Sequence, residues 1–304
     1  MSSENLAALE RRRDSIASVV PFLDAVRSIA EIGYRRADRA LEPLERFKEK
    51  LDSSLNAVAA TMVDRGSWHA LSALAAHRPL GLLVVGTQRG LCGPFNQRLI
   101  AEALRLAETR RTEGRTVQLL VLGARCQRLM EARDVEMLYT RATGSLAEPD
   151  YETIEEITLD LIGLLQNADV GEIVAVHNVP FQRFQYRPQA TSLFPMHLPE
   201  PSVPRSVPVE APALDPDALF THIATEQMLI DLYEIALKSA ASEQLARVNA
   251  MRLASENAGR MVDRLSQEIT RARNERITAS LLEVVSGFNS IQDQETASAA
   301  SAGQ

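Results

Sequence analysis

The sequence predicts a mixed α/β fold in which a long antiparallel helical pair, formed by the two ends of the chain, carries an inserted small α/β domain. Three observations predict it. The run 217–288 contains no proline and only Gly259 and Gly287 as glycines. The stretch 5–63 repeats apolar residues in steps of three and four. Between them, short apolar runs alternate with amphipathic stretches, which is typical of a parallel sheet with covering helices.

The terminal stretches define the helical pair. A helix over 217–288 would be on the order of 105 Å long, at about 1.5 Å per residue, so one globular core could not cover it. The economical partner is the chain's own N-terminal stretch. We expect an N-terminal coiled-coil helix at 1–65, an α/β domain at 78–210, a C-terminal coiled-coil helix at 215–290 and a disordered tail at 291–304, because the tail is small and polar.

The N-terminal helix has a narrow middle and two interruptions. Ala30, Gly33 and Ala37 leave room for a close partner, whereas Pro21 and Pro43 each remove a backbone hydrogen bond. We therefore expect a bent or segmented helix here.

The C-terminal helix has a seam of small or flexible side chains at coiled-coil spacing, followed by a slip. The seam residues are Met251, Ala254, Ala258, Met261, Leu265, Ile269 and Ala272, and the seam resumes as Ile277, Leu281, Val284 and Phe288.

The middle of the chain predicts a small Rossmann-like layer. The expected strands are 80–85, 117–122, an edge strand at 135–139, and 170–177. Helices are expected at 94–111, between Gly123 and Arg133, and at 151–167, with extended strands and turns from 180 to 216. Asp215 and Pro216 are typical of a helix start.

Composition excludes several classes of protein. The chain has 304 residues, a net charge of −7 and two cysteines, Cys92 and Cys126, which match no metal-ligand pattern. The charge disfavours nucleic-acid binding, and the isolated cysteines indicate reduced thiols in a cytosolic protein. No apolar run reaches about 20 residues, so no membrane span is expected, and the N-terminus has no secretory h-region.

The strongest candidate for chemistry is the glycine-rich stretch 86–96, which follows a strand and precedes a helix, where loops can cradle phosphates. It lacks the Gly-Lys-Ser/Thr ending of a P-loop and the spacing of a dinucleotide site, so a plain tight turn is favoured. Cys92 lies near the predicted helix start, but no histidine is placed beside it by a motif, which favours a structural thiol. We expect no catalytic residue, cofactor or metal.

Two C-terminal runs resemble the gamma subunit of F-type ATP synthases. Residues 242–259, SEQLARVNAMRLASENAG, resemble that family's SEQAARMxAMxxATxNA run, and residues 271–287 resemble its NKARQAxITxELxEIVxGA ending. Residues 89–96, RGLCGPFN, resemble its DRGLCGGLN loop. The resemblance spans the chain and is thin between about 130 and 210.

The resemblance implies a non-catalytic rotor, the central stalk that couples ion flow through the ring of c subunits to ATP synthesis or hydrolysis by the alpha and beta subunits. It implies epsilon as a further partner, indirect membrane association through the c-ring, and a location on the cytoplasmic face of the bacterial inner membrane. Contacts to the catalytic ring would involve Arg273, Asn274 and Thr278, with Arg252 and Arg260 as lesser candidates. The corresponding foot-domain loop residues are Arg89, Gly90, Leu91, Cys92, Gly93 and Asn96.

Departures from the family pattern indicate a divergent member. Gln88 replaces an acid, Pro94 replaces a glycine, and the lysine-rich N-terminal stretch is absent. An alternative ATPase of the N-type or sodium-type that accompanies a standard one is compatible with these changes. Two competing hypotheses are a nucleotide-binding α/β enzyme that uses the loop 86–96 and oligomerises through its helices, and a stand-alone coiled-coil adaptor.

Overall fold

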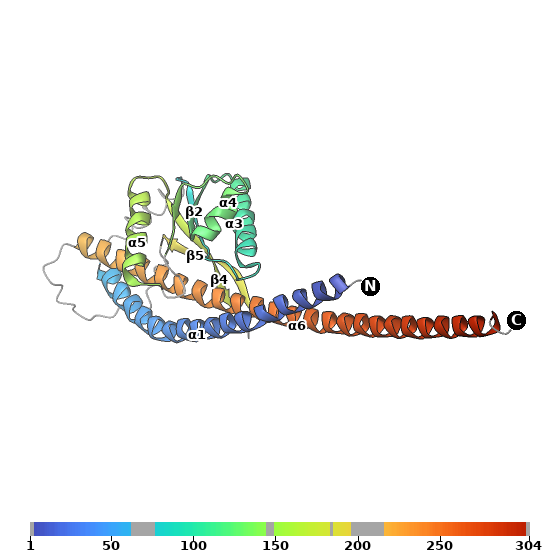
Figure 1. Cartoon of the computed structure of the whole chain (residues 1–304). Coiled ribbons are helices and arrows are strands. Elements are labelled where there is room, and N and C mark those ends of the chain that lie inside the picture. Colours follow the sequence, from blue (N-terminus) through green and yellow to red (C-terminus); the bar gives the residue numbers. More distant parts are fainter. Residues whose placement is uncertain (1–2, 62–76, 144–148, 183–184, 196–215, 302–304) are drawn as a thin grey trace. The chain divides into compact units, whose positions relative to one another are not determined.

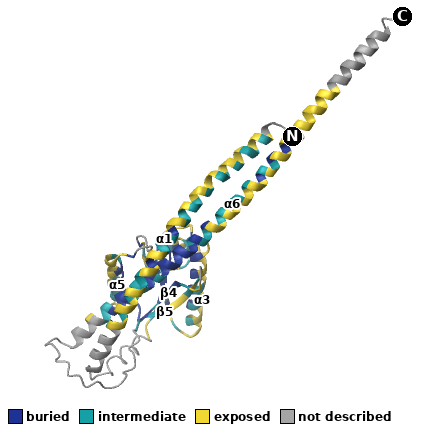
Figure 2. Ribbon diagram, turned by 90° about the horizontal axis from the view of Figure 1, so that it is seen from below, coloured by how far each residue is buried: buried dark blue, intermediate teal, exposed yellow. Residues whose placement is uncertain are grey.

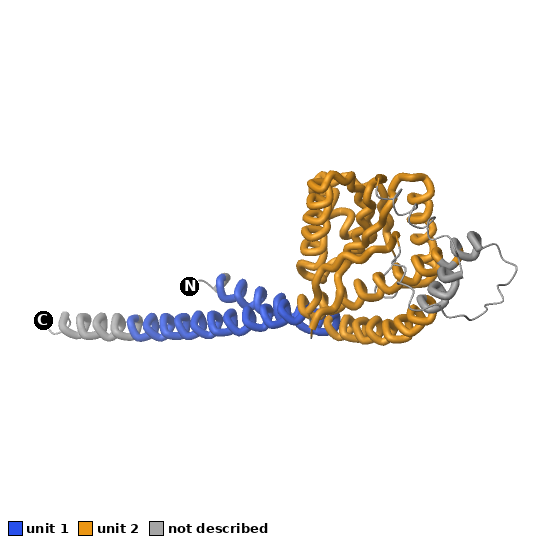
Figure 3. Tube along the Cα trace, turned by 180° about the vertical axis from the view of Figure 1, so that it is seen from behind, with its two compact units in different colours: residues 1–26, 251–304 blue, residues 27–250 orange. Residues whose placement is uncertain are grey.

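The structure is a computed structural model that describes residues 3–61, 77–143, 149–182, 185–195 and 216–301. The chain forms two compact units (Figure 3). Unit 1 contains residues 1–26 and 251–304, and unit 2 contains residues 27–250. The α/β layer predicted for 78–210 is therefore part of a larger unit, which also includes one portion of each terminal helix.

Two long helices, α1 (Ser3–Thr61) and α6 (Pro216–Ser301), contribute to both units. Within unit 1, Ser255 donates a 3.2 Å hydrogen bond to Asp24, and Arg273 forms an ion pair with Glu10. Because residue numbers that rise along α1 meet numbers that fall along α6, the predicted antiparallel pairing is confirmed in this unit.

The same pairing holds within unit 2, where α1 and α6 lie side by side beneath the sheet (Figure 1). The small seam predicted on α1 is confirmed, since Ala30 and Ala37 are buried and Ala37 packs with Ala240 and Ala241 of α6. A Cβ added at Gly33 would lie 3.1 Å from the Gln244 side chain, so the helices approach closely here.

Of the two outcomes predicted for α1, a bent or a segmented helix, segmentation is wrong, because α1 is one helix from Ser3 to Thr61. Pro21 and Pro43 both lie on the exposed face of α1. Water can therefore hydrogen-bond the carbonyl groups that each proline leaves free, at Ala17 and Arg39, while contacts along the opposite face of the helix support it.

The sequence predicts a disordered tail from residue 291, whereas the structure describes residues 291–301 as the last turns of α6. The segment 291–301 contains no proline or glycine and is rich in alanine, the best helix former. Low hydrophobicity removes a reason to pack, but it does not prevent a helix that is already nucleated from continuing.

The inserted layer is one five-stranded sheet in the order β3-β2-β1-β4-β5. Strands β1 (Leu80–Val85) and β2 (Val117–Leu122) have the predicted bounds and are parallel neighbours. Strand β4 (Glu172–Pro180) lies parallel to β1 on its other side, and β5 (Tyr186–Phe194) closes that edge antiparallel to β4.

Helices cover both faces of this sheet (Figure 1). On one face, α3 (Phe95–Thr112) and α4 (Ala124–Glu131) bury Phe95, Leu99 and Met130 against the even-numbered residues of β1. On the other face, α5 (Tyr151–Gln166) and the first buried turns of α6 pack on Leu83 and Val85. Unit 2 thus has two cores that share one sheet, and α6 contributes to both.

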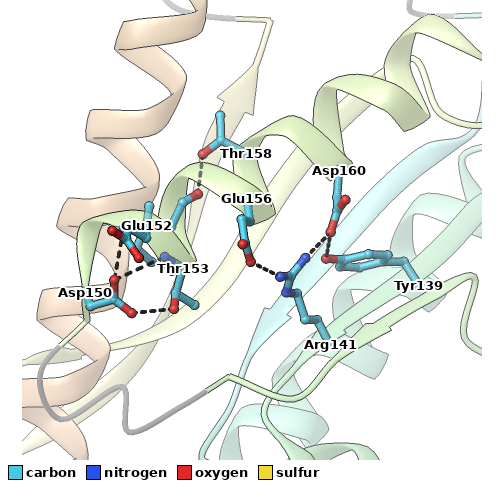
Figure 4. Close-up of polar contacts among 9 residues, drawn as sticks. Tyr139, Arg141, Asp150, Glu152, Thr153, Glu156, Thr158 and Asp160 are labelled. Carbon is cyan, nitrogen blue, oxygen red and sulfur yellow. Dashed lines mark hydrogen bonds and ion pairs between the residues drawn. The ribbon is translucent and has the colours of Figure 1, made fainter.

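The edge strand β3 (Tyr139–Arg141) begins where the predicted strand 135–139 ends. The apolar side chains of Val135 and Met137 suggested a strand, but they pack on the α3–α4 core from a loop. Figure 4 shows how β3 is tied to α5: Arg141 donates to Asp160 at 2.5 Å and pairs with Glu156, and Tyr139 donates to Asp160 at 2.7 Å. Two acids of α5, Glu156 and Asp160, therefore have a structural role in holding β3.

Candidate functional site

Two buried residues of the glycine-rich loop 86–96, Thr87 and Asn96, hydrogen-bond each other. The Thr87 amide donates to Asn96 Oδ1 at 3.1 Å, and Asn96 Nδ2 donates to Thr87 Oγ1 at 2.7 Å. The Thr87 hydroxyl in turn donates to the Arg89 carbonyl at 2.7 Å. Thr87 and Asn96 are both buried. A phosphate cradle needs backbone N–H groups turned toward a ligand, whereas the Thr87 N–H is turned inward to a side chain of the same loop.

The loop also caps the neighbouring helix α4. The Thr87 carbonyl accepts from the amides of Arg125 and Cys126 at 3.1 and 3.4 Å, and Gln88 Oε1 accepts from the Ala124 amide at 3.0 Å. These are N–H groups of the first turn of a helix, which have no partner inside the helix. The loop therefore uses the α4 N-terminus as a structural anchor.

On its other side the loop is held against α6. Ser239 on α6 donates to the Val85 carbonyl at 3.3 Å, at the carboxyl end of β1. Arg247 donates to the Gly90 carbonyl at 3.4 Å, and a Cβ at Gly93 would lie 3.7 Å from Ala250. Ligands of open α/β sheets bind outside the carboxyl ends of the strands, and here α6 lies at that position. The geometry argues against the nucleotide-binding alternative.

A buried ion pair lies on this part of α6. Glu243 is buried and pairs with Arg247, one helical turn away, which also donates to Gln244 at 2.8 Å. Burial raises the pKa of the Glu243 carboxyl, and the Arg247 guanidinium opposes that rise. Sequence reasoning recognised this stretch only by its motif. The buried polar residues Ser242, Glu243 and Gln244 interrupt a stretch of buried apolar residues on α6, and this change in composition could have marked the stretch.

Both thiols are structural. Cys92 and Cys126 are free and buried. Burial raises the pKa of Cys92 above its ordinary value and that of Cys126 to about 12. A nucleophilic cysteine needs the opposite shift and access to solvent.

The residues predicted to touch other subunits all lie on the unit 1 part of α6 and are exposed. They are Arg252, Arg260, Arg273, Asn274 and Thr278. The Arg252 guanidinium lies 2.8 Å from Glu256, Arg260 donates to Asn257, and Thr278 Oγ1 donates to the Asn274 carbonyl at 2.9 Å. Apart from the Arg273–Glu10 ion pair, these contacts stay within α6. The structure places the group along one helix and does not gather it into a pocket.

The apolar side chains of α6 beyond Ala272 are exposed. Ile277 and Val284 are 58% and 68% exposed, so α1 does not cover the predicted continuation of the seam. Figure 2 shows this end of the described part of α6 as exposed. The reason is length and direction: α1 begins at Ser3, and its Glu10 already pairs with Arg273. Sequence reasoning missed that Leu282 and Val285 are exposed as well, which makes this end of α6 apolar on more than one side.

In the part of the chain that the structure describes, no helix is long and apolar enough to cross a membrane. Over the same residues, no group of three or more histidine, cysteine, aspartate or glutamate side chains is arranged to hold a metal ion.

Comparison with known proteins gives a consistent family. The family model described as ATP synthase matches residues 5–291. A protein of Rhizorhabdus wittichii named ATP synthase gamma chain is 28% identical over 299 residues, covering 94% of this chain and 99% of the relative. A protein of Dinoroseobacter shibae with the same name is 29% identical over 298 residues, with the same coverage.

Solved structures share the fold. A chain from the Euglena gracilis mitochondrial ATP synthase, in a structure of its OSCP/F1/c-ring in rotational state 3, matches with a TM-score of 0.62 at 11% identity, covering 97% of each chain. A chain from the central stalk and c-ring structure of the Tetrahymena thermophila mitochondrial enzyme matches with a TM-score of 0.54 at 19% identity, covering 77% of this chain and 99% of that chain.

Proposed function

The chain belongs to the ATP synthase family as one of its gamma chains, and we propose that it works as the central rotor that couples ion flow to ATP synthesis or hydrolysis. In this role the chain has no catalytic group of its own. It acts by differential contact, because a shaft that favours one conformation of a neighbouring subunit at each angle shifts that subunit's nucleotide affinity.

The observation that carries this proposal is the uncovered end of α6. Its exposed apolar side chains, from Ile277 to Val285, would contact water if nothing else covered them. Contiguous exposed apolar surface of this kind marks a site of protein interaction. We infer that the catalytic ring of alpha and beta subunits surrounds this end of α6.

Polar residues beside the apolar end supply specific contacts in this proposal. The main contacts to loops of the beta subunits, here called the catch, are made by Arg273, Asn274 and Thr278. Weaker contacts are made by Arg252 and Arg260. Guanidinium and amide donors suit acidic loops because charge-assisted hydrogen bonds are strong and directional. Arg273 would exchange its pairing with Glu10 for a partner on the ring, at little cost because both side chains are partly exposed.

The remaining partners follow from the same assignment. We propose that unit 2 contacts the epsilon subunit and the c-ring, so that membrane association is indirect and the protein lies on the cytoplasmic face of a bacterial plasma membrane. The loop 86–96 then acts as a structural element that holds α6 to the sheet.

The test is purification of the complex. An affinity-tagged chain should co-purify with an alpha–beta hexamer, and the reconstituted complex should hydrolyse ATP while the chain alone does not. A stand-alone adaptor would purify without the hexamer. Nucleotide hydrolysis by the isolated chain at an ordinary enzymatic rate would favour the α/β enzyme and overturn the rotor assignment.

A further inference from the structure

Unit 2 contains a cluster of four charges between α1 and α6. Lys48 Nζ on α1 lies 2.7 Å from Asp231 Oδ1 and 2.6 Å from Glu234 Oε2, both on α6. Lys238 pairs with the second oxygen of Glu234. The Asp231 and Glu234 side chains are only 15% and 13% exposed. One lysine therefore joins two largely buried carboxylates of the other helix.

The surroundings make these carboxylates depend on their cations. Asp231 also accepts a 3.3 Å hydrogen bond from Gln227, and its pKa is raised by burial despite the opposing effect of Lys48. Burial would also raise the pKa of Glu234, but its hydrogen bonds to Lys238 and Lys48 outweigh burial and lower it. Glu234 keeps Lys238 if Lys48 is removed, whereas Asp231 keeps only a neutral amide.

The nearby seam does not by itself fix how far one helix is shifted along the other. Ala37 on α1 packs with Ala240 and Ala241 on α6, and Ala30 on α1 is buried as well. Small side chains allow the helices to approach closely, but they interlock weakly. They would pack about equally well if one helix were shifted by one turn along the other. A polar residue at a helix contact is the best-attested device for fixing such a register.

We propose that Lys48 is a positioning residue that fixes the axial register of α1 against α6 in unit 2. A shift of α1 by one helical turn, about 5.4 Å, toward the C-terminal end of α6 would bring Lys48 level with Glu234 and Lys238, and would leave Asp231 buried without a cation. Resting on the proposed rotor function, the consequence is that the two helices do not slide under torque where they meet the sheet.

The experiment measures register directly by disulfide cross-linking in the full chain. The pair Ala37→Cys with Ala241→Cys reports the observed register, because these residues pack together. The pair Ala37→Cys with Gln244→Cys, one turn along α6, reports a shifted register. The native cysteines are buried with raised pKa values, so they react slowly with oxidant.

Lys48→Met should lower the yield of the first cross-link several-fold and raise that of the second, and lower Tm by about 5 °C in the chain without added cysteines. Lys48→Arg should restore the wild-type pattern. The matched control is Arg46→Met, which removes an exposed α1 ion pair with Glu42 (68% and 76% exposed) and should change neither readout.

Equal cross-link patterns and equal Tm values for Lys48→Met and Arg46→Met would overturn the proposal. A lower Tm with an unchanged pattern would also overturn it, because Lys48 would then add stability without setting register. The chain is tested without other subunits, so failure of the rotor assignment would leave these outcomes unchanged.

Discussion

At the scale of single residues, the most informative groups are buried and polar. His177 on β4 is buried, and its Nε2 lies 3.1 Å from the Thr191 hydroxyl. Its pKa is lowered to about 4, first by burial and then by the nearby Lys238 charge. Because the folded pKa lies below the unfolded value of about 6.5, the unfolded chain takes up this proton first as pH falls.

The folded state should therefore lose stability between about pH 6.5 and pH 4. We predict that the unfolding free energy of His177→Gln depends less on pH than that of the wild type. The difference over this pH range is up to roughly 3 kcal/mol, at about 1.4 kcal/mol per pKa unit. Urea unfolding at several pH values measures it. The control His77→Gln replaces an exposed histidine and should keep the wild-type slope. Parallel pH curves for wild type and His177→Gln would refute the assignment.

A second residue-scale prediction concerns Arg247. Replacing it with methionine leaves the buried Glu243 without its cation and removes a donor to the Gly90 carbonyl. Breaking a buried pair from one side costs on the order of 3–5 kcal/mol, whereas an exposed pair contributes less than about 1 kcal/mol. Arg264→Met, which breaks an exposed pair with Glu268, is the control. Similar losses of unfolding free energy for both variants in urea would contradict a stabilising role for the buried Glu243–Arg247 pair.

At the scale of elements, the loop 86–96 can be tested through its glycines. A Cβ at Gly86 would lie 2.2 Å from the Cys126 Cβ, which belongs to helix α4 and cannot move freely. Nothing lies within 4 Å of a Cβ at Gly90. We predict that Gly86→Ala destabilises the chain by about 1–3 kcal/mol or more, whereas Gly90→Ala is close to neutral. Thermal unfolding compares them, and equal Tm values would show that the loop is not packed on α4.

Elements were predictable where one physical signal dominated. Continuous apolar runs gave β1 and β2 their correct bounds, because both strands are buried on both faces. The edge strand β3 was displaced, since apolar side chains of a loop can pack on a core as well as those of a strand. Pro21 and Pro43 predict a bent or segmented helix, yet α1 is not segmented, because a local rule of this kind yields to packing along the rest of a long helix.

The candidate site was only partly predictable from the sequence. Motif resemblance predicts that Arg273, Asn274 and Thr278 contact the catalytic ring. The structure describes all three as exposed on α6, and their contacts with another subunit stay a prediction. Periodicity could not tell whether α1 or another chain covers Ile277 and Val284, because an apolar stripe specifies burial and not its partner. The Lys48 cluster carries no local signal, since it joins residues that are far apart in sequence.

At the scale of the whole molecule, the two units allow coupling to be separated from folding. Truncation after Arg260 removes the exposed apolar end of α6 and the proposed catch, but keeps all of unit 2, residues 27–250. We predict that amide hydrogen exchange in β1, β2 and β4 stays protected, because both cores of unit 2 lie within that range. Hydrolysis of ATP by the assembled complex should then no longer drive ion transport.

The matched control is truncation after Ile291, where the family model ends, which should preserve coupling. Loss of coupling after the cut at Arg260, but not after the cut at Ile291, would locate the coupling contacts within 261–291. Full coupling after the cut at Arg260 would rule out the shaft assignment, whereas loss of exchange protection in unit 2 would show that its fold depends on unit 1. The two measurements thus separate a failure of rotation from a failure of folding, because ion transport reports the far end of α6 and hydrogen exchange reports the sheet.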